Sequence, residues 1–566
     1  MLTGSKTLRR AACSLVLLLS SCAGGLAQTA STSAAPNLAA SNLAASMPLY
    51  AAFMAGNYAA GTGHDHEAAQ FFDRAYSLDP TNPMLLHQAF VTALLANSPN
   101  APALARRMGN DPLALMVRGN ALLASGHNAK AAAVFKAMPP TGVTGLIRPL
   151  LLAWTEAGEG QFDRAIARLK QSEATAPFGP VYALNAAMIG ELAGREAEAA
   201  PLYLIAERAF PAPNLRLAQA LASFRARQGQ HQAADAILVR MVASHPDLRL
   251  ALDALEADAS RPMVESAKQG AAEAYLTLAG SLDQPQQILL RQLLLRFALR
   301  LRPDLSAARL LAANLDMARG QSAKAAATLG RIPASDPLYG PAVVQRAQIL
   351  AGMGKGAAMV PALEALAAAH PHVSTPIVLA ADIERDAGHY ASALRLYDQA
   401  LARLGPNPPG SAWAIYYGRA IAEDKSGHWP AAEVDLKRAL AIEPGQPFVL
   451  NYLGYSYAVR GIHLAKAQSM IEQALQIDPN EGAIIDSLGY VLLKRGKLAE
   501  AMREQIRAVQ AAPNDPEVNA HLADIYAAAG DYLAARNQWA RALSLHPDPA
   551  EAAKIRAALE RDDHGS

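Results

Sequence analysis

Apolar and polar positions alternate along most of the chain with the period of an α-helix, and short polar turns separate the helical stretches. The pattern is clearest from Phe448 to Pro547, where one 34-residue unit recurs three times. Pro479, Pro513 and Pro547 close successive units at the same phase. Each unit therefore predicts two helices, and the proline ends the second helix because proline cannot continue a helix interior.

Small residues recur in these units where two helices must cross closely. On the first helix they are Gly454, Gly489 and Ala523, each after a leucine. On the second helix they are Ala467, Ala474, Ala501, Ala508, Ala535 and Ala542. Larger side chains there would push the helices apart. These offsets are the tetratricopeptide (TPR) pattern. They predict an all-α TPR α-solenoid, a right-handed superhelix of about fourteen antiparallel helix pairs.

Followed through the chain, the repeat phase predicts the domain organisation. Pro246 to Pro303 spans 57 residues, which breaks the register, and three prolines between Gly405 and Gly410 make a second break. The predicted parts are an N-terminal TPR array at 46–247, an insertion or irregular helical segment at 248–270, a central degenerate array at 271–404, a regular C-terminal array at 411–549, and a capping helix and tail at 550–566. An unrelated set of amphipathic helices would not keep these positions in phase.

The first 21 residues have the features of an export signal. A basic start is followed by an apolar run, from Ala11 to Leu19, that is too short to span a membrane. Leu19-Ser20-Ser21-Cys22 resembles the lipobox of bacterial lipoproteins, which implies cleavage before Cys22 and lipidation of its thiol. The alternative is an ordinary secretory signal cut near Ala27.

Residues 22–45 are rich in Ala, Ser, Asn and Thr and predict a flexible tether. By the sorting rule of bacterial lipoproteins, Ala23 in place of Asp implies the outer membrane. Cys13 leaves with the signal, so Cys22 would be the one cysteine of the mature chain. That excludes an intramolecular disulfide and a thiolate metal cluster.

Composition and charge narrow the function classes. The chain has 52% hydrophobic but only 6% aromatic residues, which suits closely packed helices. The net charge of +2 comes from 51 basic and 49 acidic residues without charge blocks, so we predict no nucleic-acid partner.

Several short motifs resemble catalytic or metal sites, but the residues and predicted elements around them do not support that chemistry. His64-Asp65-His66 offers metal ligands but lies at a predicted helix turn, where polar residues are expected. The run from Gly352 to Gly356 lacks the Ser or Thr of a phosphate loop, and Ser456 lies in mid-helix without the strand that a nucleophile elbow needs. We predict no enzyme activity, no metal and no cofactor. An active site hidden in 248–270 is the alternative, and that segment is short for a catalytic domain.

Groove-facing positions of the first helices are better candidates for function. In this repeat they line the concave face, because they share one side of the helix. The predicted partner-binding residues are Tyr417, Phe448, Asn451, Tyr455, Asp486, Tyr490 and Asp524. Aromatic rings and short polar groups suit an extended peptide. The alternative is packing between repeats, which we expect for Tyr452 and Tyr457.

Four C-terminal motifs carry a closer resemblance. They are Tyr417 to Arg419, Val449 to Ser456, Ile484 to Tyr490 and His521 to Asp524. These resemble the signature of large proteobacterial TPR lipoproteins of the LbcA-like kind. The resemblance implies a noncatalytic adaptor at the periplasmic face of the outer membrane. Such an adaptor presents cell-wall hydrolases or other envelope proteins to a carboxyl-terminal processing protease. The alternative is a TPR scaffold for a cell-envelope assembly or polysaccharide export complex.

Overall fold

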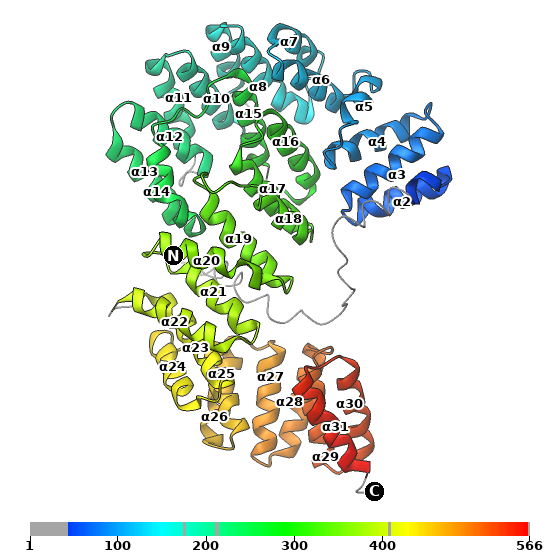
Figure 1. Ribbon diagram of the computed structural model, residues 1–566, viewed down its shortest axis with the longest axis vertical. Helices are drawn as coiled ribbons and strands as arrows, with labels where there is room; N and C mark the ends of the chain where they lie inside the picture. The colour runs from blue at the N-terminus through cyan, green and yellow to red at the C-terminus, as the bar shows by residue number, and fades with distance from the viewer. Residues whose placement is uncertain (1–42, 174–176, 210–213, 283, 406–408, 564–566) are drawn as a thin grey trace, which may run out of the picture. The chain divides into compact units, whose positions relative to one another are not determined.

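The computed structural model describes residues 43–173, 177–209, 214–282, 284–405 and 409–563. Every regular element in these ranges is an α-helix or a short 3-10 helix. The chain divides into two compact units between Ala362 and Leu363. We call the part up to Ala362 the N-terminal unit and the part from Leu363 the C-terminal unit; each is described by itself (Figure 1).

The N-terminal unit begins with twelve helices in six pairs. They are α2 Leu49–Gly61, α3 Asp65–Leu78, α4 Pro83–Leu95, α5 Ala101–Arg107, α6 Pro112–Ala124, α7 Asn128–Lys136, α8 Gly142–Gly158, α9 Phe162–Ser172, α10 Gly179–Leu192, α11 Glu196–Arg208, α12 Leu215–Arg227 and α13 His231–Ser244. An irregular stretch and a second set of helices follow. They are η1 Pro246–Ala251, α14 Leu252–Asp258, α15 Ala267–Ser281, η2 Pro285–Gln287, α16 Ile288–Leu301, α17 Ser306–Ala318, α18 Ser322–Leu329, α19 Tyr339–Gly352 and η3 Gly356–Met359.

The C-terminal unit is a regular array. Helix α20, Val360–Ala369, spans the division. After it come α21 Thr375–Asp386, α22 Tyr390–Leu404, η4 Gly410–Ala412, α23 Trp413–Lys425, α24 Trp429–Ile442, α25 Pro447–Val459, α26 Leu464–Ile477, α27 Gly482–Lys494, α28 Leu498–Ala511, α29 Pro516–Ala528, α30 Tyr532–Ser544 and α31 Pro549–Asp563.

Paired helices confirm the predicted fold class. Taking α2 to α13 and α15 to α30 two at a time gives fourteen successive pairs in the described chain. The alanines predicted at the crossings, such as Ala467 and Ala474, are fully buried. A Cβ atom on Gly454 would lie 3.0 Å from the carbonyl oxygen of Ala467, so only a small residue fits there. The local sequence thus determines how the two helices of a pair pack together. Stacking of neighbouring pairs then buries the apolar surface that each pair leaves exposed.

In the N-terminal unit the chain turns back on itself. Helices α15 and α16 pack against α4, α6, α8 and α10, which are the first helices of their pairs (Figure 1). These first helices form the concave face, so the returning helices fill the groove of their own array. Gly270 on α15 lies against the indole of the fully buried Trp154, where a Cβ would collide with the ring. Tyr275 and Asn120, 155 residues apart, exchange hydrogen bonds of 3.0 and 3.1 Å.

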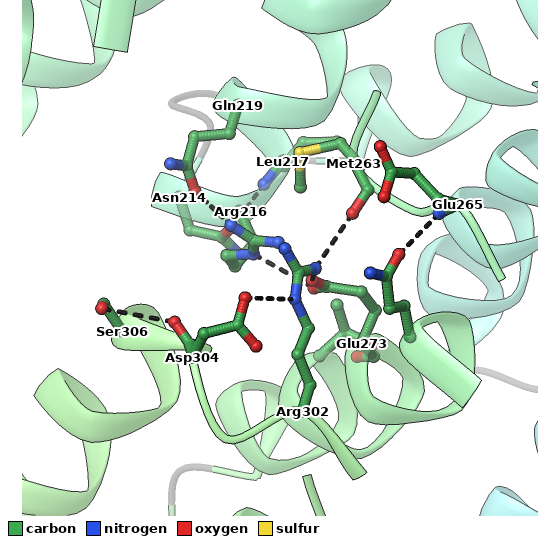
Figure 2. A network of polar contacts seen from close by, with 12 residues as sticks. Asn214, Arg216, Leu217, Gln219, Met263, Glu265, Glu273, Arg302, Asp304 and Ser306 are labelled. Carbon is green, nitrogen blue, oxygen red and sulfur yellow. Dashed lines mark hydrogen bonds and ion pairs between the residues drawn. The ribbon is translucent and has the colours of Figure 1, made fainter. Parts of the chain in front are cut away.

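A buried ion network fixes this return. Glu273 on α15 is 1% exposed and accepts from two arginines (Figure 2). Arg216 Nε on α12 donates to it at 3.1 Å, and Arg302 Nη1, just after α16, donates at 3.0 Å. Arg302 Nη1 also donates to the backbone oxygen of Met263 at 3.0 Å, which holds the loop before α15. The buried carboxylate of Glu273 thus has two cationic partners, as burial of a charge requires.

The segment predicted as irregular at 248–270 is occupied by η1, α14 and a loop, and α15 starts inside it at Ala267. Ser266 caps α15, because the backbone nitrogen of Gln269 donates to its hydroxyl at 3.4 Å. The predicted signal and most of the tether, residues 1–42, lie outside the described residues. At the end of the predicted tether, residues 43–46 form a helical turn, and Ala44 is buried against the first repeat.

Candidate partner-binding groove

The candidate site lies on the first helices α25, α27 and α29 of the C-terminal unit. Helix contacts in this unit run between nearest and next-nearest helices along the array, including α25 with α27 and α27 with α29. Tyr455, Tyr490 and Asp524 each occupy the ninth position of their helix. The repeat therefore brings the three to one face.

Three rings meet on this face, and we call Tyr455, Tyr490 and His521 the aromatic cluster. The Tyr455 and Tyr490 ring centroids are 5.3 Å apart, and the Tyr490 and His521 centroids are 4.6 Å apart. Both tyrosines are half-buried, whereas His521 is buried. Tilted rings at these distances attract each other and offer a rigid, partly apolar surface to a partner.

Buried polar groups hold the aromatic cluster from below. His521 Nδ1 lies 2.9 Å from Oδ2 of Asp486 and 3.1 Å from its Oδ1. Gln505 Nε2 also donates to Asp486 and, at 2.9 Å, to the backbone oxygen of Val518. Gly489 makes room for this glutamine, because a Cβ there would collide with its Oε1.

The charge of His521 follows from this arrangement. Burial disfavours the charged ring, but attraction and hydrogen bonding by Asp486, with further attraction by Glu517 and Asp524, raise the pKa of His521 to about 9. The imidazole is therefore positive at neutral pH and forms an ion pair with Asp486 under the tyrosines. Asp486 was predicted to face a partner. The structure instead places it 5% exposed and engaged with His521 and Gln505.

Charged groups surround the exposed edge of the aromatic cluster. Tyr455 donates its hydroxyl to Glu517 Oε1 at 2.8 Å, and burial together with Glu517 raises the pKa of Tyr455, so the hydroxyl stays protonated. Asp524 is exposed and accepts from Trp539 Nε1 at 3.0 Å. Lys494 Nζ lies 5.0 Å from the Tyr490 ring centroid, a cation-π distance. Two exposed carboxylates thus flank one lysine.

The other predicted groove residues lie on α23 and α25. Tyr417 packs edge-on against Tyr452 with ring centroids 5.9 Å apart, and Tyr452 donates its hydroxyl to Asp424 at 3.0 Å. Phe448 is half-buried in the first turn of α25. Within the described chain, the buried Oδ1 atom of Asn451 has no hydrogen-bond partner. An unpaired buried acceptor carries a cost in folding free energy.

Sequence reasoning missed His521, Gln505 and Glu517. His521 is the sixth residue of α29 and corresponds to Tyr452 on α25. This position packs between repeats, so it was not considered for the groove. A titratable residue at a packing position, 35 residues after Asp486, is the signal that would have found the pair.

Cys22 lies outside the described residues, so the structure does not place it. Within the described ranges, no helix combines the length and apolar character needed to cross a membrane. Over the same ranges, no three His, Cys, Asp or Glu side chains are grouped as metal ligands would be. Asp65 of the His64-Asp65-His66 motif is buried and forms an ion pair with Lys324 Nζ at 2.6 Å.

Comparison with known proteins supports the repeat assignment. Residues 150–212, in the N-terminal unit, and 378–447, in the C-terminal unit, match the sequence profile of the tetratricopeptide repeat. The chain therefore carries TPR repeats, which are protein-interaction scaffolds, in both units. None of the curated proteins matches the chain.

Several solved structures are similar. A tetratricopeptide repeat protein from Parabacteroides merdae is 16% identical, with 45% of this chain and 97% of its own covered and a TM-score of 0.38. A chain of the APC/C hetero-tetramer Cut9-Hcn1 is 14% identical, with 93% and 98% covered and a TM-score of 0.38. YrrB, a TPR protein with an unusual peptide-binding site, is 18% identical, with 35% and 99% covered and a TM-score of 0.27. At these scores the similarity carries no information on partners.

Proposed function

We propose that this protein is a noncatalytic adaptor whose C-terminal groove binds an extended segment of a partner protein. The observation that carries the proposal is the aromatic cluster, in which two half-buried tyrosines rest on a buried His521–Asp486 ion pair. Rigid aromatic side chains supply contact area at low entropic cost, and such residues dominate binding energy at protein interfaces.

The surrounding groups define the chemistry of the bound segment. An apolar or aromatic side chain of the partner packs on Tyr455 and Tyr490. A basic side chain suits the exposed carboxylates of Glu517 and Asp524. Asn451 also belongs to the predicted groove set, but its carbonyl oxygen is buried, so it does not contact the partner. Asp486 contributes by positioning His521 and does not contact the partner.

The proposal extends to location and cargo. The basic start, the apolar run and Leu19-Ser20-Ser21-Cys22 support a lipid anchor at Cys22 on the periplasmic face of the outer membrane. The resemblance of the C-terminal motifs to LbcA-like lipoproteins supports a carboxyl-terminal processing protease as the partner, with cell-wall hydrolases as its substrates. The protein would then present envelope proteins for degradation.

The test is affinity isolation of the tagged protein from its native envelope, followed by mass spectrometry. We expect co-enrichment of a carboxyl-terminal processing protease that is lost in Tyr455→Ala/Tyr490→Ala. The matched control is Tyr532→Ala, because Tyr532 is 59% exposed and begins the second helix α30. Partners that bind both variants equally would remove the groove from the proposal. A synthesis or export complex in place of the protease would favour the envelope scaffold.

The anchor has its own test. Cys22→Ser should move the protein from the membrane fraction to the soluble periplasmic fraction, because several acyl chains on one residue would be lost. Membrane attachment that persists in this variant would contradict lipidation at Cys22. The interaction repeats themselves would be unaffected by that result.

A further inference from the structure

A pocket of about 340 Å³ lies in the N-terminal unit, where the returning helices face the first repeats. Its lining residues come mostly from helices α16, α17 and α18 and from α3 and the end of α4. Its lining includes Asp65, Leu95, Asn97, Gln292, Leu295, Arg296, Leu299, Arg300, Pro303, Arg309, Ala312, Asp316, Lys324, Thr328 and Arg331. No residue of the aromatic cluster takes part, so the pocket is independent of the proposed groove.

The pocket carries an excess of positive charge. Its lining has four arginines and one lysine against two carboxylates, those of Asp65 and Asp316. Both carboxylates are already paired with Lys324, whose Nζ lies 2.6 Å from Asp65 Oδ2 and 3.1 Å from Asp316 Oδ1. Gln292 Nε2 also donates to Asp316 Oδ1 at 3.1 Å. Asp65 and Asp316 attract Arg296, and Asp304 and Asp336 attract Arg309, without forming an ion pair with either arginine.

Three of these arginines have no direct partner. Over the part of the chain that the structure describes, no hydrogen bond or ion pair involves the guanidinium group of Arg296, Arg309 or Arg331. Arg300 differs, because its Nε donates to Asn97 Oδ1 at 3.1 Å and its Nη2 to the backbone oxygen of Ser98 at 3.3 Å. Arg296 and Arg309 are half-buried, whereas Arg331 is exposed at the rim.

Burial and mutual repulsion act on these cations together. Burial, helped by repulsion from Arg331, outweighs the attraction of Asp316 and Asp65 and lowers the pKa of Arg296. Burial and Arg331 likewise lower the pKa of Arg309. Guanidinium groups nevertheless stay charged at neutral pH. Holding like charges together in a half-buried place costs free energy, and a bound anion would recover it.

The remaining wall is mixed, with Asn97, Gln292 and Thr328 beside apolar side chains. Leu95 and Leu295 are buried, and Leu299 and Ala312 are half-buried beside the arginines. A ligand that fits this lining has one strongly anionic end and one apolar part.

We propose that this pocket binds a small organic molecule that carries a phosphate group, with Arg296, Arg309 and Arg331 around the phosphate and the leucines against the organic part. A phosphate monoester carries nearly two negative charges at neutral pH and presents three acceptor oxygens. It matches an excess of several positive charges better than a single carboxylate does, and guanidinium groups bind it through paired hydrogen bonds.

The experiment is isothermal titration of the full mature chain, at low salt, with phenyl phosphate and with inorganic phosphate. We expect saturable binding of phenyl phosphate at one site, tighter than that of inorganic phosphate. Arg296→Gln and Arg309→Gln should each weaken it about tenfold, because a hydrogen-bonded charge pair is lost. The matched control is Arg208→Gln, an exposed arginine at the end of α11, which should bind as the parent does.

Other outcomes overturn the proposal or part of it. Absence of saturable binding, or equal binding by the Arg296 and Arg208 variants, would overturn it. Equal affinity for the two phosphates would overturn the role of the apolar side chains. Binding of polyglutamate without phenyl phosphate would replace it with an acidic protein partner. Arg331→Gln should also weaken binding, and it should not unfold the chain by removing a contact, because Arg331 is exposed and its guanidinium forms no hydrogen bond or ion pair within the described residues. Unchanged binding by this variant would remove Arg331 from the site.

Discussion

The two units are built from the same repeat, but their concave faces differ: the chain covers the concave face in the N-terminal unit and not in the C-terminal unit. Asn120 on α6 and Ser223 on α12 occupy the ninth helix position, as Tyr455 and Tyr490 do in the C-terminal unit. Asn120 bonds to Tyr275, and Ser223 donates to the backbone oxygen of Arg261 at 2.5 Å. The tyrosines stay half-exposed. The groove of the N-terminal unit is thus filled by its own chain, whereas the tyrosines of the C-terminal unit have no such segment over them.

The comparison teaches that a TPR groove is a binding surface only where the chain does not occupy it. In the N-terminal unit, buried polar pairs and one indole bind helices α15 and α16. Those contacts are intramolecular, so they carry no cost of association. In the C-terminal unit the equivalent side chains remain available, at the cost of exposing aromatic surface to water.

Removing the buried carboxylate that fixes the return should have the largest effect. Glu273→Ala leaves Arg216 without its ion pair and leaves Arg302 with only the longer pair to Asp304, at 3.7 Å, so we expect a loss of about 3–5 kcal/mol in the N-terminal unit. Hydrogen exchange with mass spectrometry should show faster exchange in α15 and α16 and no change in α25 to α29. Glu207→Ala is the control, because Glu207 pairs with the half-exposed side chain of Arg240. Unchanged exchange in α15 would show that the network does not hold the return.

Raising the pH should weaken only the C-terminal unit. The folded-state pKa of His521, about 9, lies above its ordinary value of 6.5. The charged His521 therefore contributes its full share to the free energy of unfolding below about pH 6.5. This contribution disappears as the pH rises through about 9, which lowers the free energy of unfolding by about 3 kcal/mol. Urea unfolding at pH 6.5 and 9.5, with hydrogen exchange to locate the change, measures it. His521→Gln should remove the pH dependence. An unchanged dependence in that variant would assign it to another group.

Crowding the contact between α15 and α8 should have an intermediate effect. Gly270→Ala places a methyl group against Trp154, and we expect a loss of about 1–3 kcal/mol from overpacking. Gly280→Ala on the same helix is the control, because nothing lies within 4 Å of its Cβ position. It should be neutral or slightly stabilising, since alanine favours helices. Equal melting temperatures for both variants would contradict the close contact at Gly270.

The smallest effect is expected at the edge of the open groove. Tyr455→Phe removes the hydrogen bond to the exposed Glu517 and should cost about 0.5–1 kcal/mol of unfolding free energy or less. Tyr275→Phe removes a buried hydrogen bond and leaves Asn120 without this partner, so we expect the free energy of unfolding to fall by about 1–3 kcal/mol. Denaturant unfolding of both variants tests the order. A larger loss at Tyr455 would mean that this hydrogen bond, and not the packing, maintains the groove.

Much of the fold could be predicted because it is local. The 34-residue phase correctly predicted the helix pairs, and the glycines and alanines at the crossings are buried as expected. The candidate site was harder to predict from the sequence. Tyr455 and Tyr490 were predicted on the groove face and lie there half-buried, whereas Asp486 turned inward because His521 and Gln505 satisfy it. Those two partners sit on different helices, so no local pattern announces them. Binding by these residues stays a prediction.

The sequence by itself determined the repeat, the ends of the helices and the fold class, because helix propensity, proline stops and small residues act over one or two helices. Tertiary structure alone decided which groove is open. That choice depends on Asn120 meeting Tyr275 and on Glu273 meeting Arg216, across 155 and 57 residues. Contacts at such separations form only when the repeats stack. In the sequence, the residues that make them cannot be told from other polar residues of a helix.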